Sequence, residues 1–289
     1  MKILLIGRSG QVATEILRRA PAGLAVTALG REGADLSDPA ACARAVAGAD
    51  AQAVINAAAW TAVDKAESEE AAARVVNAEA PAAMAQAAAA RGLPFVHIST
   101  DYVFDGQGAA PFALDHPVDP QNAYGRTKLL GEEGVRAAGG SHVVLRTSWV
   151  FSSHGANFVK TMLRLGRERG EINVVDDQVG GPTPASAIAD ACLSIARALA
   201  DGQPGGTHHL SGAPDTSWAG FARVIMREAG LSCRVNPIPS SAFPTPARRP
   251  LNSRLDGSSL EQAFGIAKPD WQAALREVLR DLHAQAAAG

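Results

Sequence analysis

The fold is inferred from two stretches, Ser99-Thr100-Asp101-Tyr102-Val103-Phe104-Asp105-Gly106 and Tyr124-Gly125-Arg126-Thr127-Lys128. The apolar run at 96–98 leads into the first stretch, which predicts that Ser99 and Thr100 lie at the carboxyl end of a strand. Ligands bind at that edge in doubly wound α/β folds. Tyr124 and Lys128 are spaced i and i+4, so they share one face of a helix. A hydroxyl, a phenol and an ammonium gathered there would deliver a proton to a ketone beside a nicotinamide.

Strands alternate with helices on both sides of these stretches. Short apolar runs predict strands at 3–6, 24–29, 53–55, 93–98 and 142–146, each followed by a helical pattern. Five such units predict an α/β fold, a Rossmann-like doubly wound parallel sheet with a smaller, interleaved α/β C-terminal lobe. We expect residues 1–150 to form an NAD(P)-binding domain, completed by parts of 176–210, and residues 151–289 to form most of a substrate lobe.

A glycine loop follows the first strand and has the pattern Gly7-x-x-Gly10-x-x-Ala13. Gly7 permits a tight turn, Gly10 lets backbone amides approach a pyrophosphate at a helix N-terminus, and Ala13 allows close helix packing. A glycine turn without a ligand is the alternative. The residues expected to bind the cofactor here are Gly7, Arg8, Ser9, Gly10, Gln11 and Val12.

The ends of the next two strands supply further candidate cofactor contacts. Arg31 lies where a dinucleotide fold reaches the adenosine ribose, and an arginine accommodates a 2′-phosphate, so NADPH is favoured, with Arg8 as a helper. NADH stays open because Arg31 is one loop residue. Asp35 and Leu36 could border the adenine. After the third strand, Asn56 could hold backbone or ribose, and three alanines leave room for a ligand: Ala57, Ala58 and Ala59.

Two charged segments have both a functional and a structural interpretation. Asp64, Lys65 and Glu67 could form a charged site, but charges at a helix start more often cap that helix and suit its dipole. This helix is expected to continue to about residue 91. Between 247 and 255, three arginines on a proline-rich segment could clamp a diphosphate, or they could be ordinary surface residues.

The composition excludes several classes of partner. The net charge of −2 is too balanced for a nucleic-acid or acidic-membrane partner, and the sequence has no stretch apolar enough to span a membrane. Its three cysteines are far apart and form no CxxC motif, which fits a reducing compartment. We therefore expect a cytoplasmic enzyme.

The motifs together resemble the extended short-chain dehydrogenases/reductases, and more closely the dTDP-4-dehydrorhamnose reductases. The resemblance covers almost the whole chain, with Phe243 where the family has tyrosine. It implies NAD(P)H-dependent reduction of the C4 ketone of dTDP-4-dehydro-L-rhamnose, the last step to the dTDP-L-rhamnose used for surface glycans such as O antigen. The segments that carry it are 7–13, 56–67, 99–106, 124–128, 146–151, 157–165, 176–183 and 243–255.

The resemblance also assigns roles. Hydride from NADPH reaches C4, Tyr124 protonates the developing alkoxide, Lys128 favours the phenolate and holds the nicotinamide ribose, and Thr100 orients the ketone. Ser99, Tyr124 and Lys128 are expected to contact the cofactor. Candidates for the sugar pocket are Thr61, Val63, Thr100, Asp101, Tyr102 and Trp149. Candidates for the diphosphate or nucleotide are Arg249, Asn252 and Arg254.

Departures from the family bear on metal use and on alternatives. Some relatives form a magnesium-bridged dimer through glutamates; Glu15 matches one such position, but Ser186 replaces another, so we expect no required metal and a monomer or weak homodimer. A 4,6-dehydratase or epimerase would carry Asp-Glu after the threonine, whereas here Tyr102 follows Asp101. A non-catalytic regulatory homologue need not keep Tyr124, Lys128 and Thr100 together.

Overall fold

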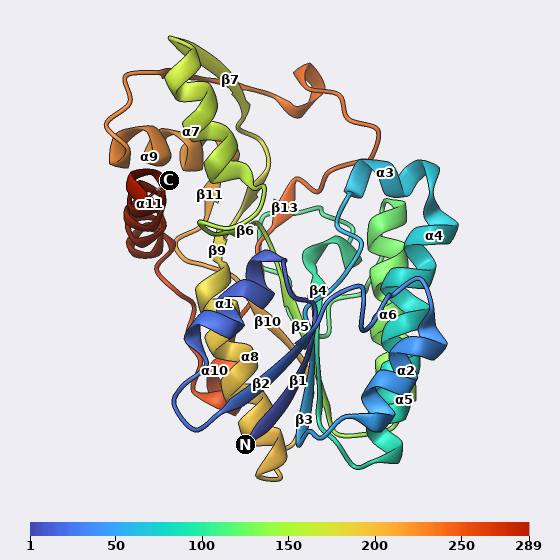
Figure 1. Ribbon diagram of the computed structural model, residues 1–289. Helices are drawn as coiled ribbons and strands as arrows, with labels where there is room; N and C mark the ends of the chain where they lie inside the picture. Colours follow the sequence, from blue (N-terminus) through green and yellow to red (C-terminus); the bar gives the residue numbers. More distant parts are fainter. Residues whose placement is uncertain (289) are drawn as a thin grey trace.

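A six-stranded parallel sheet forms the centre of the computed structural model, which describes residues 1–288 (Figure 1). The strand order is β10-β5-β4-β3-β1-β2, and every neighbouring pair is parallel. The predicted doubly wound fold is confirmed. The strands are β1 (Lys2–Ile6), β2 (Ala25–Leu29), β3 (Ala53–Asn56), β4 (Phe95–Thr100), β5 (His142–Thr147) and β10 (Gly206–Leu210).

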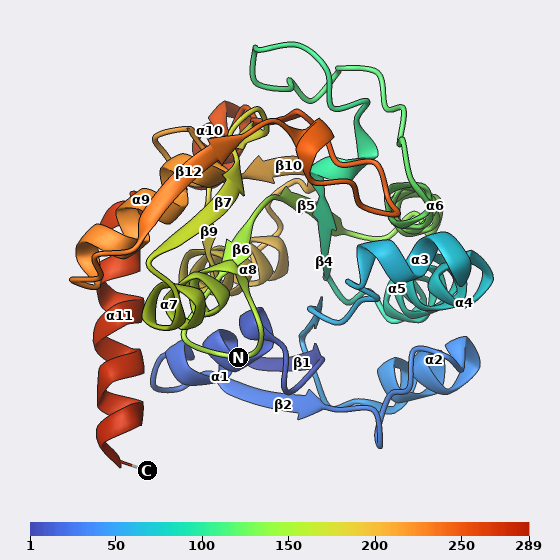
Figure 2. The same ribbon diagram turned by 90° about the horizontal axis from the view of Figure 1, so that it is seen from above.

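Helices cover both faces of this sheet, which explains why its inner strands are almost wholly apolar (Figures 1 and 2). One face carries α1 (Gln11–Arg19) and α8 (Ala185–Ala200), which pack against each other, while α10 (Ser258–Phe264) lies beside β10. The other face carries α2 (Pro39–Gly48), α5 (Ala80–Ala90) and α6 (Ala123–Ala137). The sheet's carboxyl edge is thereby left between two helical layers.

The expected long helix to about residue 91 is wrong. The segment divides into α3 (Val63–Ser68), α4 (Glu70–Arg74), a π-helical turn η1 (Val75–Glu79) and α5. The π turn buries Asn77, whose side chain accepts from Trp60 N and donates to Trp60 O and the Thr127 hydroxyl. These bonds tie the loop after β3 to α6, which compensates for the interrupted helix.

A second lobe lies above the sheet in Figure 1 and has its own apolar core. Its parallel strand pair is β7 (Glu171–Val175) and β12 (Arg234–Ile238). Its helices are α7 (Phe158–Glu168), α9 (Trp218–Glu228) and α11 (Trp271–Ala288). The short elements between the lobes are η2 (Asp101–Val103), β6 (Val150–Phe151), β8 (Val179–Gly180), β9 (Thr183–Pro184), β11 (Thr216–Ser217), η3 (Ser240–Ala242) and β13 (Asn252–Ser253).

The chain passes more than once between the sheet and the second lobe. After α7 and β7 it returns to supply α8 and β10, and β10 pairs with β5 over 206–210. The lobe boundary at residue 150 stays a prediction, and residue 289, the last of the predicted second lobe, lies outside the described residues. Within the described part, no helix is both long and apolar enough to span a membrane.

Each of the three large apolar clusters contains one free, buried cysteine. Cys192 lies in the cluster between the sheet and the α1–α8 layer, Cys42 in the cluster on the opposite face, and Cys233 in the second lobe. Burial raises the pKa of Cys42 to about 11 and that of Cys192 to about 12. These thiols therefore act as core residues.

Candidate active site

The structure brings Thr100, at the end of β4, next to Tyr124, in the first turn of α6. The Thr100 hydroxyl donates to Asp101 Oδ1 at 3.0 Å, accepts from Tyr102 N at 3.2 Å, and hydrogen-bonds the Tyr124 side chain. The ring of Tyr102 meets that of Tyr124 edge-on, with centroids 5.4 Å apart. A phenol and a hydroxyl thus meet at the carboxyl edge of the sheet, as the sequence predicts.

Close packing at the start of α6 sets the position of Tyr124. Asn122 caps the helix by accepting from Gly125 N at 2.8 Å. A Cβ on Gly125 would lie 2.2 Å from Tyr102 O, so only glycine allows the helix to approach this loop. Glu67 accepts from Ala123 N at 2.7 Å. The expectation that Glu67 caps its own helix is wrong, because it caps the helix of Tyr124.

Burial shifts the pKa of each titratable group at this edge. Burial raises the pKa of Tyr124. The nearby Asp101 and Tyr102 add to this rise, and the hydrogen bond with Thr100 opposes it. Burial also raises the pKa of Asp101 to about 6. It lowers the pKa of Lys128 to about 8, against the opposing charge of Glu132. A phenol with a raised pKa stays protonated at neutral pH and is available as an acid.

Lys128 is turned towards the interior. Its Nζ donates to Ile98 O at 2.7 Å and lies 3.4 Å from His97 Nε2. Its expected effect on the phenol of Tyr124 stays a prediction. The role of Lys128 towards the ribose stays a prediction.

The Ser99 side chain faces the interior. Its hydroxyl donates to Glu132 Oε1 at 2.6 Å, and Arg146 binds both oxygens of Glu132, at 2.9 and 2.7 Å. Arg146 and Ser99 outweigh the effect of burial, so the pKa of Glu132 is lowered. The Arg146 guanidinium lies over the Phe104 ring. The Ser99 hydroxyl is therefore engaged, and only its backbone remains for a cofactor.

The glycine loop fits a pyrophosphate. Gly7 has φ +109°, and a Cβ there would lie 3.4 Å from the backbone of Ala57 and Ala58. Gly10 precedes α1 without any side-chain cap, and a Cβ on it would meet nothing within 4 Å. The first amides of α1 are therefore free to bind an anion.

Two other residues of the loop, Gln11 and Val12, have side chains engaged within the protein, which leaves their backbone for the predicted cofactor contact. Gln11 Oε1 accepts from Ser152 Oγ at 2.9 Å and Asn157 Nδ2 at 3.0 Å, which ties the loop to the second lobe. Val12 packs in the core. Arg8 and Ser9 are exposed.

The loop expected to reach the adenosine contains one residue that the sequence interpretation missed, Glu32. Arg31 is exposed, while Arg8 forms a 3.4 Å ion pair with Glu32, so an acidic group accompanies the two arginines. Leu36 packs in the core, and Asp35 accepts from the amide of residue 37 at 2.9 Å. An arginine, the typical partner of the 2′-phosphate of NADPH, and a carboxylate, the typical partner of the ribose of NADH, therefore both lie at this end.

The end of β3 contributes small side chains. Ala57, Ala58 and Ala59 are half-buried. Asn56 is buried, accepts from Ala58 N at 3.2 Å and donates to His97 Nδ1 at 3.1 Å. The side-chain amide of Asn56 therefore holds the backbone, which is one of the two roles expected for it. It is not free to bind a ribose, which is the other.

Arg249 reaches the predicted sugar pocket. Its guanidinium donates to Asp64 Oδ2 at 2.6 Å and to the Tyr102 hydroxyl at 3.4 Å. Asp64 lies in the first turn of α3, as the expected match with the helix dipole requires, but it does not cap that helix. It instead anchors the segment 247–255, including Ala247 N at 3.1 Å. Thr61 is exposed and Val63 begins α3, the helix that carries Asp64.

Asn252 and Arg254, the other two candidates for the diphosphate or nucleotide, have partners other than those of Arg249. Asn252 is buried and donates to Gln107 O at 3.1 Å and Ala110 O at 2.8 Å. Its Oδ1 accepts from Arg254, which also pairs with Asp215 at 3.4 Å. Asn252 therefore holds the loop after β4, and the binding of a diphosphate by this segment stays a prediction.

Trp149 has a strained backbone beside the sheet. Its φ is +51°, rare for a residue other than glycine, and its ring stacks on Trp218 with centroids 3.6 Å apart and an 11° tilt. Strain of this kind is maintained only where the surroundings hold it. The stack joins the end of β5 to α9.

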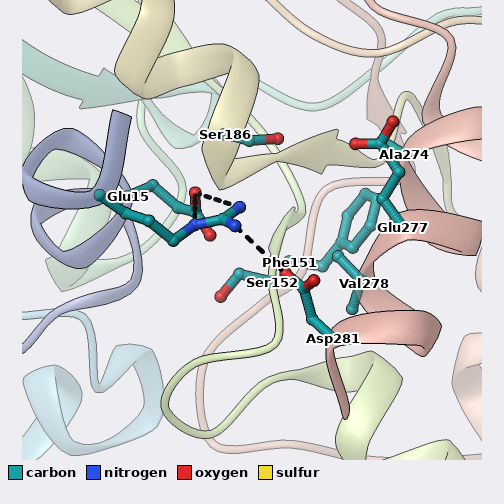
Figure 3. A pocket seen from close by; sticks show the side chains of 9 residues that line it. Glu15, Phe151, Ser152, Ser186, Ala274, Glu277, Val278 and Asp281 are labelled. Carbon is teal, nitrogen blue, oxygen red and sulfur yellow. Dashed lines mark hydrogen bonds and ion pairs between the residues drawn. The ribbon is translucent and has the colours of Figure 1, made fainter. Parts of the chain in front are cut away.

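Glu15 and Ser186, the two positions tied to metal use, line one pocket with residues of α11 (Figure 3). Glu15 accepts from Arg18 at 3.0 Å and pairs with His154 at 3.1 Å, and Arg18 extends towards Asp281 at 3.6 Å. Across residues 1–288, no group of three or more His, Cys, Asp or Glu side chains could hold a metal ion.

Comparisons with known proteins identify the relatives of this chain. The model of the RmlD substrate binding domain matches residues 1–284. A dTDP-4-dehydrorhamnose reductase of Burkholderia thailandensis is 46% identical over 99% of this chain and 100% of the relative. The structure of a dTDP-4-dehydrorhamnose reductase from Clostridium acetobutylicum has a TM-score of 0.92 and 37% identity, covering 98% of this chain and all of that one. The enzyme of Bacillus anthracis, solved in complex with NADP, has a TM-score of 0.90 and 31% identity, covering 97% and 99%.

Proposed function

The chain belongs to the family of the RmlD substrate binding domain, and we propose that it reduces the C4 ketone of dTDP-4-dehydro-L-rhamnose with NADPH to give dTDP-L-rhamnose. The contact between Tyr124 and Thr100 at the carboxyl edge of the sheet carries this proposal. When bound, the reduced nicotinamide supplies the hydride that adds to C4. The first amides of α1 would hold its pyrophosphate.

In this proposal, Tyr124 is the acid that protonates the C4 oxygen. Its raised pKa keeps the phenol protonated until negative charge develops on that oxygen. Thr100 orients the ketone, and its own hydrogen bond to Asp101 fixes the hydroxyl's direction. Tyr102, held by Arg249, borders the sugar. A dehydratase would need a second carboxylate after Asp101, where this chain has the phenol of Tyr102.

The test follows NADPH oxidation near 340 nm with dTDP-4-dehydrorhamnose as substrate. Tyr124→Phe should lower kcat by about 10²–10⁴-fold and leave NADPH binding unchanged, because only the acidic proton is removed. Absence of oxidation by the unaltered protein would exclude the reductase. An active Tyr124→Phe would remove Tyr124 as the acid.

We also propose that catalysis requires no metal, in a monomer or weak homodimer that works in the cytoplasm. Glu15 is already paired with Arg18 and His154, which leaves it little capacity for a cation. The buried free thiols fit a reducing compartment. EDTA should change neither the turnover nor the mass of the protein in solution; a loss of activity would contradict this.

A further inference from the structure

A buried ion pair joins α6 to β5 and has no part in the mechanism above. Glu132 on α6 and Arg146 on β5 are 0% and 4% exposed. Arg146 Nε donates to Glu132 Oε1 at 2.9 Å, and its Nη2 donates to Oε2 at 2.7 Å. Two bonds between planar groups fix both the distance and the direction between their elements, whereas contact between apolar side chains has no direction.

Neighbouring groups hold the pair in this arrangement. The Ser99 hydroxyl on β4 donates to Glu132 Oε1 at 2.6 Å. The Arg146 guanidinium lies 5.0 Å from the centre of the Phe104 ring, and its Nη1 lies 3.5 Å from His209 Nε2. Because both charges are buried, any movement that separates them leaves an unpaired charge out of water, which is costly. The pair therefore holds α6, β4 and β5 in one relative position.

The position of α6 along the sheet decides where the phenol of Tyr124 lies. Ser99 and Arg146 are partners in the register of β4 and β5, and Thr100 follows Ser99 directly. On α6, Glu132 comes eight residues after Tyr124, which is about 12 Å along the helix axis. Over this length an α-helix moves as a rigid unit. A shift of Glu132 along the sheet therefore moves the Tyr124 phenol away from Thr100.

A second ion pair on the same carboxylate provides a contrast. Arg136 Nη1 donates to Glu132 Oε2 at 3.1 Å, but Arg136 lies on α6 itself and its side chain is 38% exposed. A pair within one helix cannot hold that helix against another element, and water weakens it. Arg146 is therefore the residue that connects α6 to the sheet, and Arg136 serves as its matched control.

We propose that Glu132 and Arg146 are positioning residues, which set where α6 lies along β4 and β5 and so hold the Tyr124 phenol against Thr100. They act through Ser99 and the helix, not on the reacting atoms. The assignment deepens the proposed reductase function and rests on it for its catalytic meaning. The placement of Tyr124 is independent of that function.

NMR of the cofactor-free protein with labelled tyrosines tests the placement. The chain has two tyrosines, Tyr102 and Tyr124, whose rings meet edge-on with centroids 5.4 Å apart, so the ring signals depend on how α6 lies. Arg146→Lys keeps the charge but lacks the second bond, and should move the signals of Tyr124. Arg136→Lys should leave them in place. Unmoved signals in Arg146→Lys would overturn the proposal, whether or not the protein proves to be a reductase.

A double variant keeps the proposal testable if Arg146→Lys does not fold. Glu132→Met combined with Arg146→Met replaces the pair by apolar side chains, a change that buried ion pairs often tolerate without loss of stability. The apolar contact has no direction, so the double variant should fold but should show displaced or broadened Tyr124 signals. Signals identical to those of the unaltered protein would overturn the proposal.

Single-turnover oxidation of bound NADPH by dTDP-4-dehydrorhamnose then tests the catalytic meaning. The rate constant should fall by about 10–100-fold in Arg146→Lys and in the double variant, because a misplaced phenol slows the reaction. The amplitude, which measures the folded fraction, should not change, and Arg136→Lys should alter neither quantity. A loss of amplitude with an unchanged rate constant would indicate a merely structural pair and overturn the catalytic role. Absence of turnover in the unaltered protein would exclude the reductase and leave the NMR result standing.

Discussion

The two ends of the sheet's carboxyl edge offer the proposed ligands different kinds of groups. The cofactor end, residues 7–12, 31–36 and 57–59, presents backbone: α1 begins without a side-chain cap, and the arginines around it are exposed. The catalytic end, Thr100, Asp101, Tyr124 and Lys128, presents side chains whose pKa values burial has shifted or whose hydrogen bonds are fixed. Anion binding needs only amides in the right direction, whereas proton transfer needs side chains removed from water.

The largest expected effect is at the catalytic end. Thr100→Val removes the hydroxyl that bonds Asp101 and Tyr124, and should lower kcat about 100-fold, or about 2.7 kcal/mol in activation free energy. NADPH affinity, measured by fluorescence titration, should not change. Thr207→Val on β10 is the matched control. A loss below threefold would show that Thr100 does not orient the reacting groups.

Asp101→Asn should raise the free energy of unfolding. The size of this increase would show how much stability the protein loses by burying a carboxylate at the catalytic end. The pKa of Asp101 is raised from 3.8 to about 6 by burial, so its charge destabilises the fold by about 3 kcal/mol above pH 6. This cost fades as the pH falls from 6 towards 3.8, because the folded carboxyl then binds a proton that the unfolded one does not. Urea unfolding should therefore show that the variant gains free energy of unfolding at pH 8 and that this gain roughly halves at pH 5. A gain that is the same at both pH values would contradict the raised pKa of Asp101.

Gly10→Ala should weaken the cofactor end alone. A Cβ on Gly10 meets no protein atom, so the melting temperature should be unchanged while NADPH binds about tenfold less tightly, because the methyl group enters the space of the pyrophosphate. Gly7→Ala is the contrasting variant: its φ of +109° makes it destabilising by about 1–3 kcal/mol. Unchanged NADPH affinity in Gly10→Ala would remove this loop as the anion site.

Arg31→Ala is the mildest change. The ratio of kcat/KM for NADPH to that for NADH should fall by less than tenfold, because Arg8 remains and Glu32 already offers NADH an acidic partner. An unchanged ratio would mean that Arg31 does not contact the 2′-phosphate. Glu32→Gln, measured in parallel, should move the ratio the other way.

The cofactor end could be predicted from sequence because its parts are neighbours in the chain. The run at 3–6, the glycines and α1 follow one another, and each obeys a local rule. The helix that carries Tyr124 was predicted for the same reason. The parallel arrangement of the five predicted strands followed from their alternation with helices.

What could not be predicted depends on contacts between distant segments. Nothing near Asn252 in sequence indicates that it holds the loop after β4, and nothing near Asp64 indicates Arg249 as its partner. Ser99 and Asn56 lie at strand ends as predicted, but their side chains bond Glu132 and His97, which only the packed sheet brings close. The sequence interpretation treated His97 as part of an apolar strand.

The sixth strand illustrates the same limit. Gly206–Leu210 contains two adjacent histidines and no apolar alternation, so its place beside β5 depends on α8 returning the chain to the sheet. The interrupted helix before α5 follows from the buried Asn77, whose three bonds favour a π turn over regular α-helix.

Because the three cysteines lie in three different apolar clusters, their reactivity reports on the local opening of each part of the molecule. An alkylating reagent reacts with a thiolate only after local opening, since burial both shields the thiol and, for Cys42 and Cys192, raises its pKa. The rates at which Cys192, Cys42 and Cys233 are labelled therefore report how often each face of the sheet and the second lobe open. Three equal rates would mean that the interleaved chain unfolds as one cooperative unit, and unequal rates would identify the part that opens first.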